Sequence, residues 1–345
     1  MKKIFDCITF FRENFITNIR FEIIDKVVDY FVVCESMYDH KGNKKELNFK
    51  LKNQKFKNKL IYLVLKRPFN SSDSLWERQA EQREYIFKGL KFAKPDDYIM
   101  FSDPDEIPNP EILKNFELNK NYGIFLQKFF CYKFNIFNNF ETPWEGTRVC
   151  KKKNLKSIDF MRQKIVLKNL KQPFWKIYKE KSIESFKDGG WHFNSLLTPE
   201  EISLKLKTFA HTEFAKPEYS DVNIIKENIQ RNKDLFKRNI TYKRVELDNT
   251  FPKHILENKE VWLELIVDSV RVGLRQQRPV VVLKEKTGER YLPSAAIKSL
   301  SPAEYAATSR AKRKGTKAGK QHVAQPKTIA KKTKRFRAAR GGMVI

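Results

Sequence analysis

Four short runs of β-branched and aromatic residues, separated by helix-like segments, constrain the fold of this chain more than any other feature. Such runs, bounded by polar residues, are typical of buried strands. Between the second and third runs, residues 75–93 predict a helix, with Ser74 as its candidate N-cap. Strands that alternate with helices predict an α/β fold with a mostly parallel sheet flanked by helices. The predicted strands are residues 29–36, 59–66, 97–102 and 122–130.

A further helix is predicted at residues 198–210, where the start signals are strong. Thr198 is the candidate cap, Pro199 suits the first helical position, and Glu201 completes a capping box. These local signals fix where the helix should begin.

The character of the chain changes near residue 260. Residues 1–260 hold the predicted strands and helices, and we expect them to form one folded domain. Residues 261–293 alternate like strands around a Lys-Thr-Gly turn, which predicts a short β-hairpin-like segment. Residues 294–345 are rich in Ala, Lys, Arg and Gly without apolar periodicity, which predicts a disordered basic tail. Residues 261–345 contain 20 Lys and Arg and 5 acidic residues, and so carry +15 of the net charge of +28.

The cysteines and the lack of a long apolar run bear on the compartment. Cys7, Cys34, Cys131 and Cys150 have no metal-finger spacing, and each lies in an apolar neighbourhood. We expect four buried free thiols, which favours a reducing compartment. No apolar run reaches the roughly 18 residues of a transmembrane helix. The sequence therefore predicts a soluble, cytoplasmic protein without a transmembrane segment.

The segment FSDPDEIPNP places carboxylates directly after the third predicted strand. The carboxyl end of such a strand faces the crevice of an open α/β sheet. Pro104 favours an extended chain, in which Asp103 and Asp105 point to the same side while Glu106 points elsewhere. Convergent carboxylates suit Mg²⁺ or Mn²⁺, which also bind substrate phosphates. The alternative is a solvent-exposed acidic turn.

Six short motifs, in order along the chain, together resemble glycosyltransferase family 17. The resemblance runs from about residue 3 to 255, and its most specific parts are D-x-D-E-I-P and G-W-H. The motifs are FVVCES (31–36), WERQAEQR (76–83), FSDPDEIPNP (101–110), WEGTR (144–148), GGWHF (189–193) and KTFAHTEF (207–214).

The resemblance implies a glycosyltransferase A-like, Rossmann-like fold and the inverting transfer of a sugar to a glycan acceptor. The implied donor is a nucleotide sugar, UDP-N-acetylglucosamine (UDP-GlcNAc), and the implied cofactor is Mn²⁺ or Mg²⁺ on Asp103 and Asp105. A cation held there would stabilise the charge on the leaving UDP without proton transfer. Inversion also requires one general base to deprotonate the acceptor hydroxyl.

Basic residues on the helix before the acidic loop are candidates for binding the donor. Arg78 and Arg83 could pair with its phosphates, although ion pairs with Glu77 or Glu81 on the helix surface are the alternative. Glu35, at the end of the first predicted strand, stands where such folds receive the nucleotide. Its alternative is an ordinary carboxylate at a strand end.

The GGWHF motif supplies two further candidates. Gly189 and Gly190 allow a close backbone turn before Trp191 and His192. His192 could complete the metal shell or contact the diphosphate, and Trp191 offers a flat face to a sugar ring. The alternative is a core tryptophan and a hydrogen-bonded histidine. His211, after the 198–210 helix, is a candidate phosphate contact.

Three carboxylates are candidates for the general base. Glu213 follows the 198–210 helix, Glu145 lies in WEGTR, and Asp188 precedes the two glycines. The sequence does not choose among them.

Two other functions compete with sugar transfer. A phosphohydrolase could use the acidic loop, but its D-x-D-x-T motif would need a threonine where Ile107 stands. The basic tail could bind nucleic acid without sequence preference, or an anionic membrane. Residues 261–293 also resemble, faintly, the start of a bifunctional nuclease domain, and the match stops at Pro293.

Overall fold

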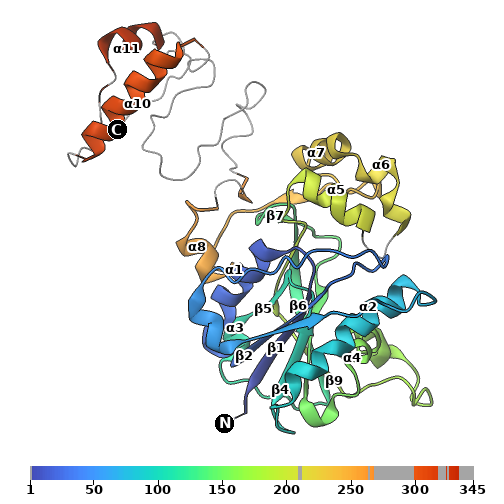
Figure 1. The fold of residues 1–345 in the computed structure, drawn as a ribbon. Coiled ribbons are helices and arrows are strands. Elements are labelled where there is room, and N and C mark those ends of the chain that lie inside the picture. The colour runs from blue at the N-terminus through green and yellow to red at the C-terminus, as the bar shows by residue number, and fades with distance from the viewer. Residues whose placement is uncertain are drawn as a thin grey trace. The chain divides into compact units, whose positions relative to one another are not determined.

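The computed structural model describes residues 2–208, 212–262, 265–267, 299–317, 324 and 326–333. The chain divides into two compact units, Met1–Ser269 and Val270–Ile345. In the first unit, helices cover both faces of a central sheet (Figure 1). The α-helices described there are α1 (Asn14–Ile24), α2 (Leu75–Glu84), α3 (Pro110–Leu113), α4 (Ile158–Lys164), α5 (Pro199–Thr208), α6 (Pro217–Ser220), α7 (Val222–Gln230) and α8 (Lys253–Glu257). The 3-10 helices are η1 (Asp25–Val27), η2 (Gln54–Lys59), η3 (Tyr85–Leu90), η4 (Lys152–Asn154), η5 (Leu167–Lys171) and η6 (Thr212–Ala215).

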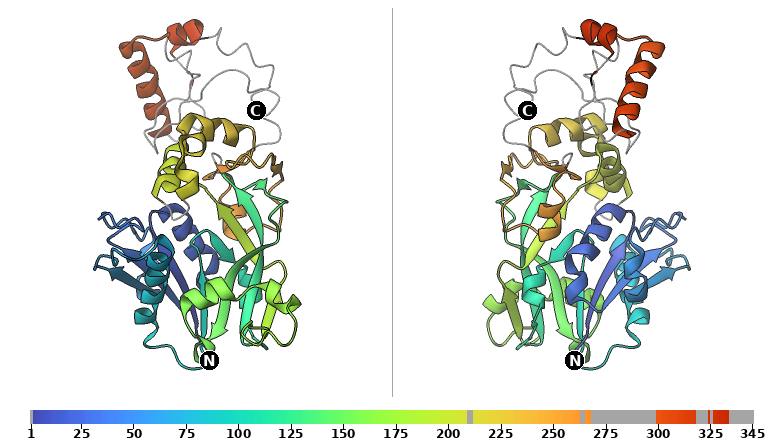
Figure 2. Two further views of the ribbon diagram at one scale, coloured as in Figure 1. Left: turned by 90° about the vertical axis from the view of Figure 1, so that its right-hand side faces the viewer. Right: turned by 90° about the vertical axis from the view of Figure 1, so that its left-hand side faces the viewer.

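The first half of the sheet is parallel, with β1 (Ile4–Phe10) at its centre. β2 (Tyr30–Ser36) and β4 (Tyr98–Ser102) pair with β1 on either side, and β3 (Leu60–Leu65) pairs with β2. Figure 2 shows this half, in blue and cyan, beside the green strands that follow. The parallel arrangement brings the carboxyl ends of these four strands to one edge of the sheet.

A long antiparallel strand, β8 (Trp144–Lys151), joins the two halves of the sheet. It pairs with β4 on one side and with β6 (Tyr122–Cys131) on the other, so β6 runs parallel to β4. β9 (Ile183–Phe186) and β10 (Gly190–Asn194) pair in parallel with β6, and β5 (Glu106–Pro108) pairs antiparallel with β10. The described residues form eleven strands in this sheet, the other two being β7 (Ile136–Phe137) and β11 (Lys243–Arg244).

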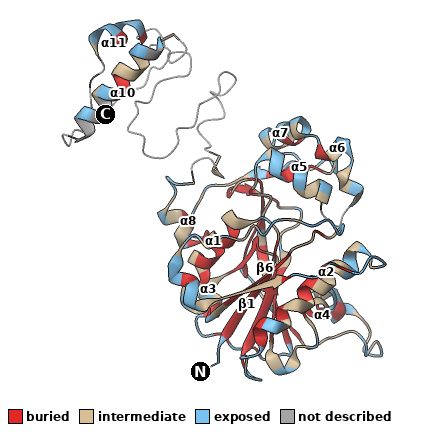
Figure 3. Ribbon diagram, in the orientation of Figure 1, coloured by how far each residue is buried: buried red, intermediate tan, exposed pale blue. Residues whose placement is uncertain are grey.

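Both faces of β1 are buried, and its side chains alternate between two hydrophobic clusters. Ile8 and Phe10 pack in the cluster that includes α1, whereas Phe5 and Cys7 pack in the cluster that includes η3 and α4. Figure 3 shows β1 and β6 buried along almost their whole length. The predicted α/β fold, with a sheet flanked by helices, is confirmed.

The local predictions agree with the structure at most elements. The four predicted strands are β2, β3, β4 and β6, and the cysteines are buried free thiols. The capping box of α5 is formed, because the Glu201 N–H donates to Thr198 Oγ1 at 3.2 Å and the Thr198 N–H donates to Glu201 Oε2 at 2.8 Å. The predicted helix 75–93 is shorter: Ser74 caps α2, which passes into η3 after Glu84.

None of the four predicted strands corresponds to β1, the central strand of the parallel half. Asp6 interrupts its apolar run, and that carboxylate is buried against Arg20 of α1. Arg20 Nη2 and Nε lie 2.6 and 2.7 Å from the two Asp6 carboxylate oxygens. The ion pair satisfies both buried charges, so a charged residue can stand in the centre of the sheet.

The C-terminal unit differs from the predicted disordered tail in two segments. α10 (Pro302–Lys317) and α11 (Lys327–Thr333) are helices. Ser301 and Glu304 form a capping box at the start of α10, with distances of 3.2 and 2.7 Å, and the many alanines favour a helix. The predicted hairpin at 261–293 lies almost wholly outside the described residues. None of the helices in the described part of the chain has the length and hydrophobicity to cross a bilayer.

Candidate functional site

The carboxyl ends of the parallel strands open on a cavity of about 660 Å³. Thr9 near the end of β1, Ser36 of β2, Cys131 of β6 and Asn194 of β10 all line it. The loop between β4 and β5, residues 103–105, lines the same cavity. Crevices at this edge of an α/β sheet are where such folds bind ligands.

Asp103 and Asp105 both face this cavity. The side chain of Asp103 is 37% exposed, and its Oδ2 atom lies 2.6 Å from Nη2 of Arg162. Asp105 is more deeply placed, with its Oδ1 atom 3.6 Å from Nε2 of His192. Burial by itself would raise the pKa of Asp105. His192 and Lys205 lower that pKa by more than burial raises it, so it falls to about 2. Asp105 therefore carries its charge at neutral pH and is available to a cation.

Glu106 turns away from the cavity and is fully buried. Its Oε1 atom accepts hydrogen bonds from Trp144 Nε1 at 2.7 Å and Arg162 Nη2 at 2.9 Å. Its Oε2 atom accepts from Arg162 Nη1 at 3.0 Å and from the Asp103 N–H at 3.2 Å. Glu106 thus holds in place three groups that line the cavity, without reaching it.

Arg162 projects from α4 to Asp103, the first residue of the loop, and to Glu106, the residue that follows it. Its Nη2 atom contacts both Asp103 and Glu106. Burial lowers the pKa of Arg162, but the carboxylates of Asp103 and Glu106 raise it more, so the guanidinium stays charged. A fixed positive charge therefore lies beside the acidic loop.

His192 lies on the cavity side of β10, between aromatic rings. Its imidazole stacks on Phe129 with ring centroids 4.2 Å apart and lies 5.0 Å from the ring of Trp144. The Nδ1 atom is buried and has no hydrogen-bond partner in the described part of the chain. The other ring nitrogen, Nε2, is the one that lies toward Asp105, so His192 meets the acidic loop through that atom.

Lys205 of α5 brings a second cation to the cavity. Burial lowers its pKa, but the carboxylates of Asp105, Glu13 and Asp103 raise it more. The ammonium group therefore stays charged close to the two aspartates, and a diphosphate in the cavity would meet positive charge on this side.

The acidic loop offers an open rather than a closed metal site. Within the described residues, no group of three or more His, Cys, Asp or Glu side chains is placed to enclose a metal ion. Asp103 and Asp105 supply two carboxylates beside a cavity. This arrangement fits Mg²⁺ or Mn²⁺, which often take one or two carboxylates and complete their shell with water and substrate phosphate.

A protein-family model for glycosyltransferase family 17 matches residues 1–247. The chain belongs to glycosyltransferase family 17. The match confirms the resemblance seen in the motifs and identifies the chain as a glycosyltransferase. The faint resemblance of residues 261–293 to a nuclease domain is not borne out. No curated protein matches the chain significantly.

Solved structures of low sequence identity resemble parts of this family 17 chain. Glucosyl-3-phosphoglycerate synthase from Mycobacterium tuberculosis is 11% identical, over 74% of this chain and 92% of that one, with a TM-score of 0.32. A glycosyltransferase involved in glycosylation of the PBCV-1 major capsid is 10% identical, over 54% and 81%, with a TM-score of 0.26. The inositol-1-phosphate CTP transferase from T. maritima is 13% identical, over 54% and 85%, with a TM-score of 0.28.

The two arginines of the family 17 motif on α2 have different places. Arg83 lines the cavity and is held by Asp159 of α4, whose Oδ1 atom lies 2.7 Å from its Nη1. Arg78 lies away from the cavity lining and donates to the carbonyl oxygens of His40 and Ser71 at 3.1 and 3.2 Å. The structure therefore leaves Arg83 as a candidate for donor binding, whereas Arg78 braces two loops.

Glu35 is a structural carboxylate, which corrects its assignment to the donor site. It is fully buried at the end of β2 and is not among the residues that line the cavity. Both oxygens are used to anchor the loop after β2 and the neighbouring strand. Its donors are Lys45 Nζ at 2.6 Å, the Asn48 N–H at 2.7 Å, the Phe49 N–H at 3.0 Å and Tyr62 Oη at 2.7 Å.

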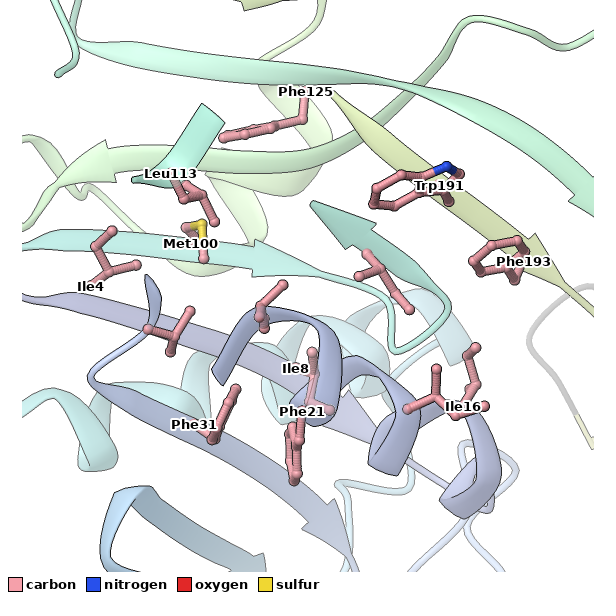
Figure 4. Close-up of a cluster of buried hydrophobic side chains, with 14 of the residues drawn as sticks. Ile4, Ile8, Ile16, Phe21, Phe31, Met100, Leu113, Phe125, Trp191 and Phe193 are labelled. Carbon is pink, nitrogen blue, oxygen red and sulfur yellow. The ribbon is translucent and has the colours of Figure 1, made fainter. Parts of the chain in front are cut away.

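Trp191 and Asp188 also lie outside the cavity lining. Successive strand residues face opposite sides, so Trp191 enters the hydrophobic core while His192 faces the cavity. Figure 4 shows Trp191 in that core, and its Nε1 donates to the Thr250 carbonyl oxygen at 3.0 Å. Asp188 is exposed and lies just before the first residue of β10, at the opposite end of that strand from Asn194. These positions do not agree with the predictions that Trp191 offers its face to a sugar ring and that Asp188 is the general base.

Glu145, another of the predicted general bases, already has hydrogen-bond and ion-pair partners. Its Oε2 atom accepts from the Leu167 N–H at 3.2 Å and lies 3.6 Å from Arg148 Nη2. It lines a second cavity, of about 650 Å³, which shares Trp144 and Arg162 with the first.

The motif that follows α5 is described in part. Glu213 is exposed in η6, next to Phe214, which lines the first cavity. His211 lies outside the described residues.

Among the cavity residues that were not predicted as site residues are Arg162, Lys205 and Trp144. Trp144 stands in the WEGTR motif, which was a usable signal. Arg162 and Lys205 lie on helices where basic residues are common, and nothing local marks them. Only the packing of α4 and α5 against the sheet edge reveals them.

Proposed function

We propose that this glycosyltransferase is metal-dependent and inverting, and that it transfers N-acetylglucosamine from UDP-GlcNAc to a glycan acceptor. The observation that carries the proposal is the pair of carboxylates, Asp103 and Asp105, facing a cavity that is also lined by Arg83 and Lys205. Negative groups for a cation and positive groups for phosphate meet at one place. The choice of UDP-GlcNAc and of a glycan rests on the family resemblance.

Asp103 and Asp105 would hold Mn²⁺ or Mg²⁺ with the donor diphosphate. The pKa of Asp105, about 2, keeps that carboxylate ionised, and Nε2 of His192 lies 3.6 Å from its Oδ1 atom. When bound, the cation would supply charge stabilisation for the departing diphosphate.

The chain's own cations have separate roles in this proposal. Lys205 and Arg83 line the cavity and would pair with phosphate oxygens. Arg162 is committed to Glu106 and Asp103, so it orients the acidic loop instead. Of the three predicted bases, Glu213 stays in the proposal because it is next to Phe214, which lines the cavity. Glu145, which lines the adjoining cavity, is the alternative, and Asp188 lies outside both linings.

A donor screen with purified protein tests the proposal. UDP-sugars would be offered with Mn²⁺ or Mg²⁺, and released UDP measured, with UDP-GlcNAc expected to give the fastest release. Asp105→Asn keeps the shape and removes the charge, so transfer should fall by about a hundredfold or more. Asp188→Asn is the matched control, because Asp188 is exposed outside the cavity lining, and it should retain activity.

Two outcomes would contradict this assignment. Full activity of Asp105→Asn would remove the carboxylate from the mechanism, and undiminished turnover in excess EDTA would remove the metal. Preference for another nucleotide sugar would overturn only the choice of donor.

A further inference from the structure

The segment between α4 and β9 exposes an unusual group of apolar side chains. Five of the large hydrophobic residues that are exposed in the described chain lie within residues 170–178, which we call the aromatic loop. Their exposed fractions are 47% for Leu170, 82% for Phe174, 66% for Trp175, 90% for Ile177 and 71% for Tyr178. Contiguous exposed apolar groups of this kind mark interaction sites.

The aromatic loop has a defined backbone held by its own hydrogen bonds. Lys181 Nζ and the Lys176 N–H both donate to the Pro173 carbonyl oxygen, at 2.5 and 3.1 Å. The Lys179 N–H donates to the Lys176 carbonyl oxygen at 3.0 Å, and the Ile177 N–H to that of Trp175 at 2.9 Å. These bonds hold a tight turn, so the apolar side chains are presented outward by an ordered segment. Figure 1 shows this light green segment beside α4.

Lysines are interleaved with the apolar residues. Residues 164–181 contain six lysines and one acidic residue, Glu180, a net charge of +5. Lys168 and Lys171 are exposed, and Lys179 Nζ lies 5.2 Å from the ring centroid of Tyr178. The apolar tip therefore stands in a positively charged surround, which is complementary to an anionic surface.

We infer that the aromatic loop inserts into the interfacial layer of an anionic phospholipid bilayer. Trp175 and Tyr178 suit the depth of the headgroups, Phe174 and Ile177 suit the start of the acyl chains, and the lysines would face lipid phosphates. A stable protein interface buries about 800 Å² on each partner, more than a short turn offers, whereas a bilayer needs only a few inserted side chains. The inference is independent of the donor and metal proposed above.

Vesicle binding by the full chain tests this surface. The C-terminal segment beyond Glu304 holds 13 Lys and Arg and no acidic residue, so it would attract anionic vesicles by charge alone. At about 0.5 M NaCl the screening length falls to about 4 Å and that contribution weakens, while apolar insertion persists. Binding would be measured by co-sedimentation with phosphatidylcholine vesicles, with and without about 30 mol% phosphatidylglycerol as the anionic lipid.

The variants compare two equally exposed phenylalanines. Phe174 and Phe92 are both 82% exposed. Phe174→Ser with Trp175→Ser should weaken binding to anionic vesicles by about tenfold or more, since two aromatic side chains leave the interface. Phe92→Ser should bind like the wild type. Each variant should keep the wild-type thermal midpoint, because the altered side chains are largely exposed.

Fluorescence identifies the inserted residue. Lipids with brominated acyl chains should quench part of the tryptophan emission, and Trp175→Phe should lose that quenched part while still binding. Unchanged binding of the double variant, or a loss matched by Phe92→Ser, would overturn the inference. So would a wild-type dimer in solution that the double variant abolishes, because the aromatic loop would then contact a second copy of the chain.

Discussion

At the scale of single residues, Glu106 is a buried carboxylate that holds groups of the site in place without lining the cavity itself. It accepts four hydrogen bonds, two of them from Arg162, and is itself fully buried. Glu106→Gln keeps the shape but leaves the guanidinium with half its compensating charge, so we expect a loss of about 3 kcal/mol in the free energy of unfolding. Transfer should fall as well, because Glu106 would hold Arg162 and the backbone of Asp103 less firmly. Denaturant unfolding measures the first effect. Asp103→Asn is the control, since Asp103 is 37% exposed and should cost little stability. Wild-type stability of Glu106→Gln would show that the network contributes nothing.

At the scale of elements, β10 carries His192 into the cavity only because its first residue is a glycine. Gly190 has φ +128°, and an added Cβ would overlap the Ile107 carbonyl oxygen of β5. Gly190→Ala should therefore cost about 2–4 kcal/mol, from strain and from the displaced strand pairing. Gly42→Ala is the matched control. Gly42 also has a positive φ, +95°, but its added Cβ would meet the end of the Arg78 side chain at 3.0 Å. Thermal and denaturant unfolding of both variants separate backbone strain from overlap. Equal losses would mean that the contact with β5 is unimportant.

At the scale of the whole molecule, the first compact unit continues past residue 260, to Ser269. The Phe134 N–H donates to the Leu265 carbonyl oxygen at 2.8 Å, and Asn135 exchanges hydrogen bonds of 2.7 and 2.8 Å with the backbone of Val267. We expect chain 1–269 to fold alone and to retain transfer activity, and chain 1–260 to have a lower thermal midpoint. Calorimetry of the two truncated chains checks this, with UDP release as the readout of activity. Equal midpoints would place the end of the folded unit at residue 260.

Short-range signals were enough to predict much of the fold and the acidic loop that lines the cavity. Residue type and spacing of a few positions define β2, β3, β4 and β6, the N-cap of α2, the capping box of α5 and the acidic loop. Each of these depends on interactions between near neighbours in the chain. The motifs, taken together, predicted the family.

The tertiary structure decided what those signals left open. Arg162 meets Glu106 and Asp103 across 56 and 59 residues of sequence, and Asp6 is acceptable in β1 only because Arg20 reaches it. Of the neighbours Trp191 and His192, the register of β10 sends one into the core and the other into the cavity. Partners so far apart are selected by packing, and the energy of a buried charge depends on whether such a partner is present. No local pattern carries that information.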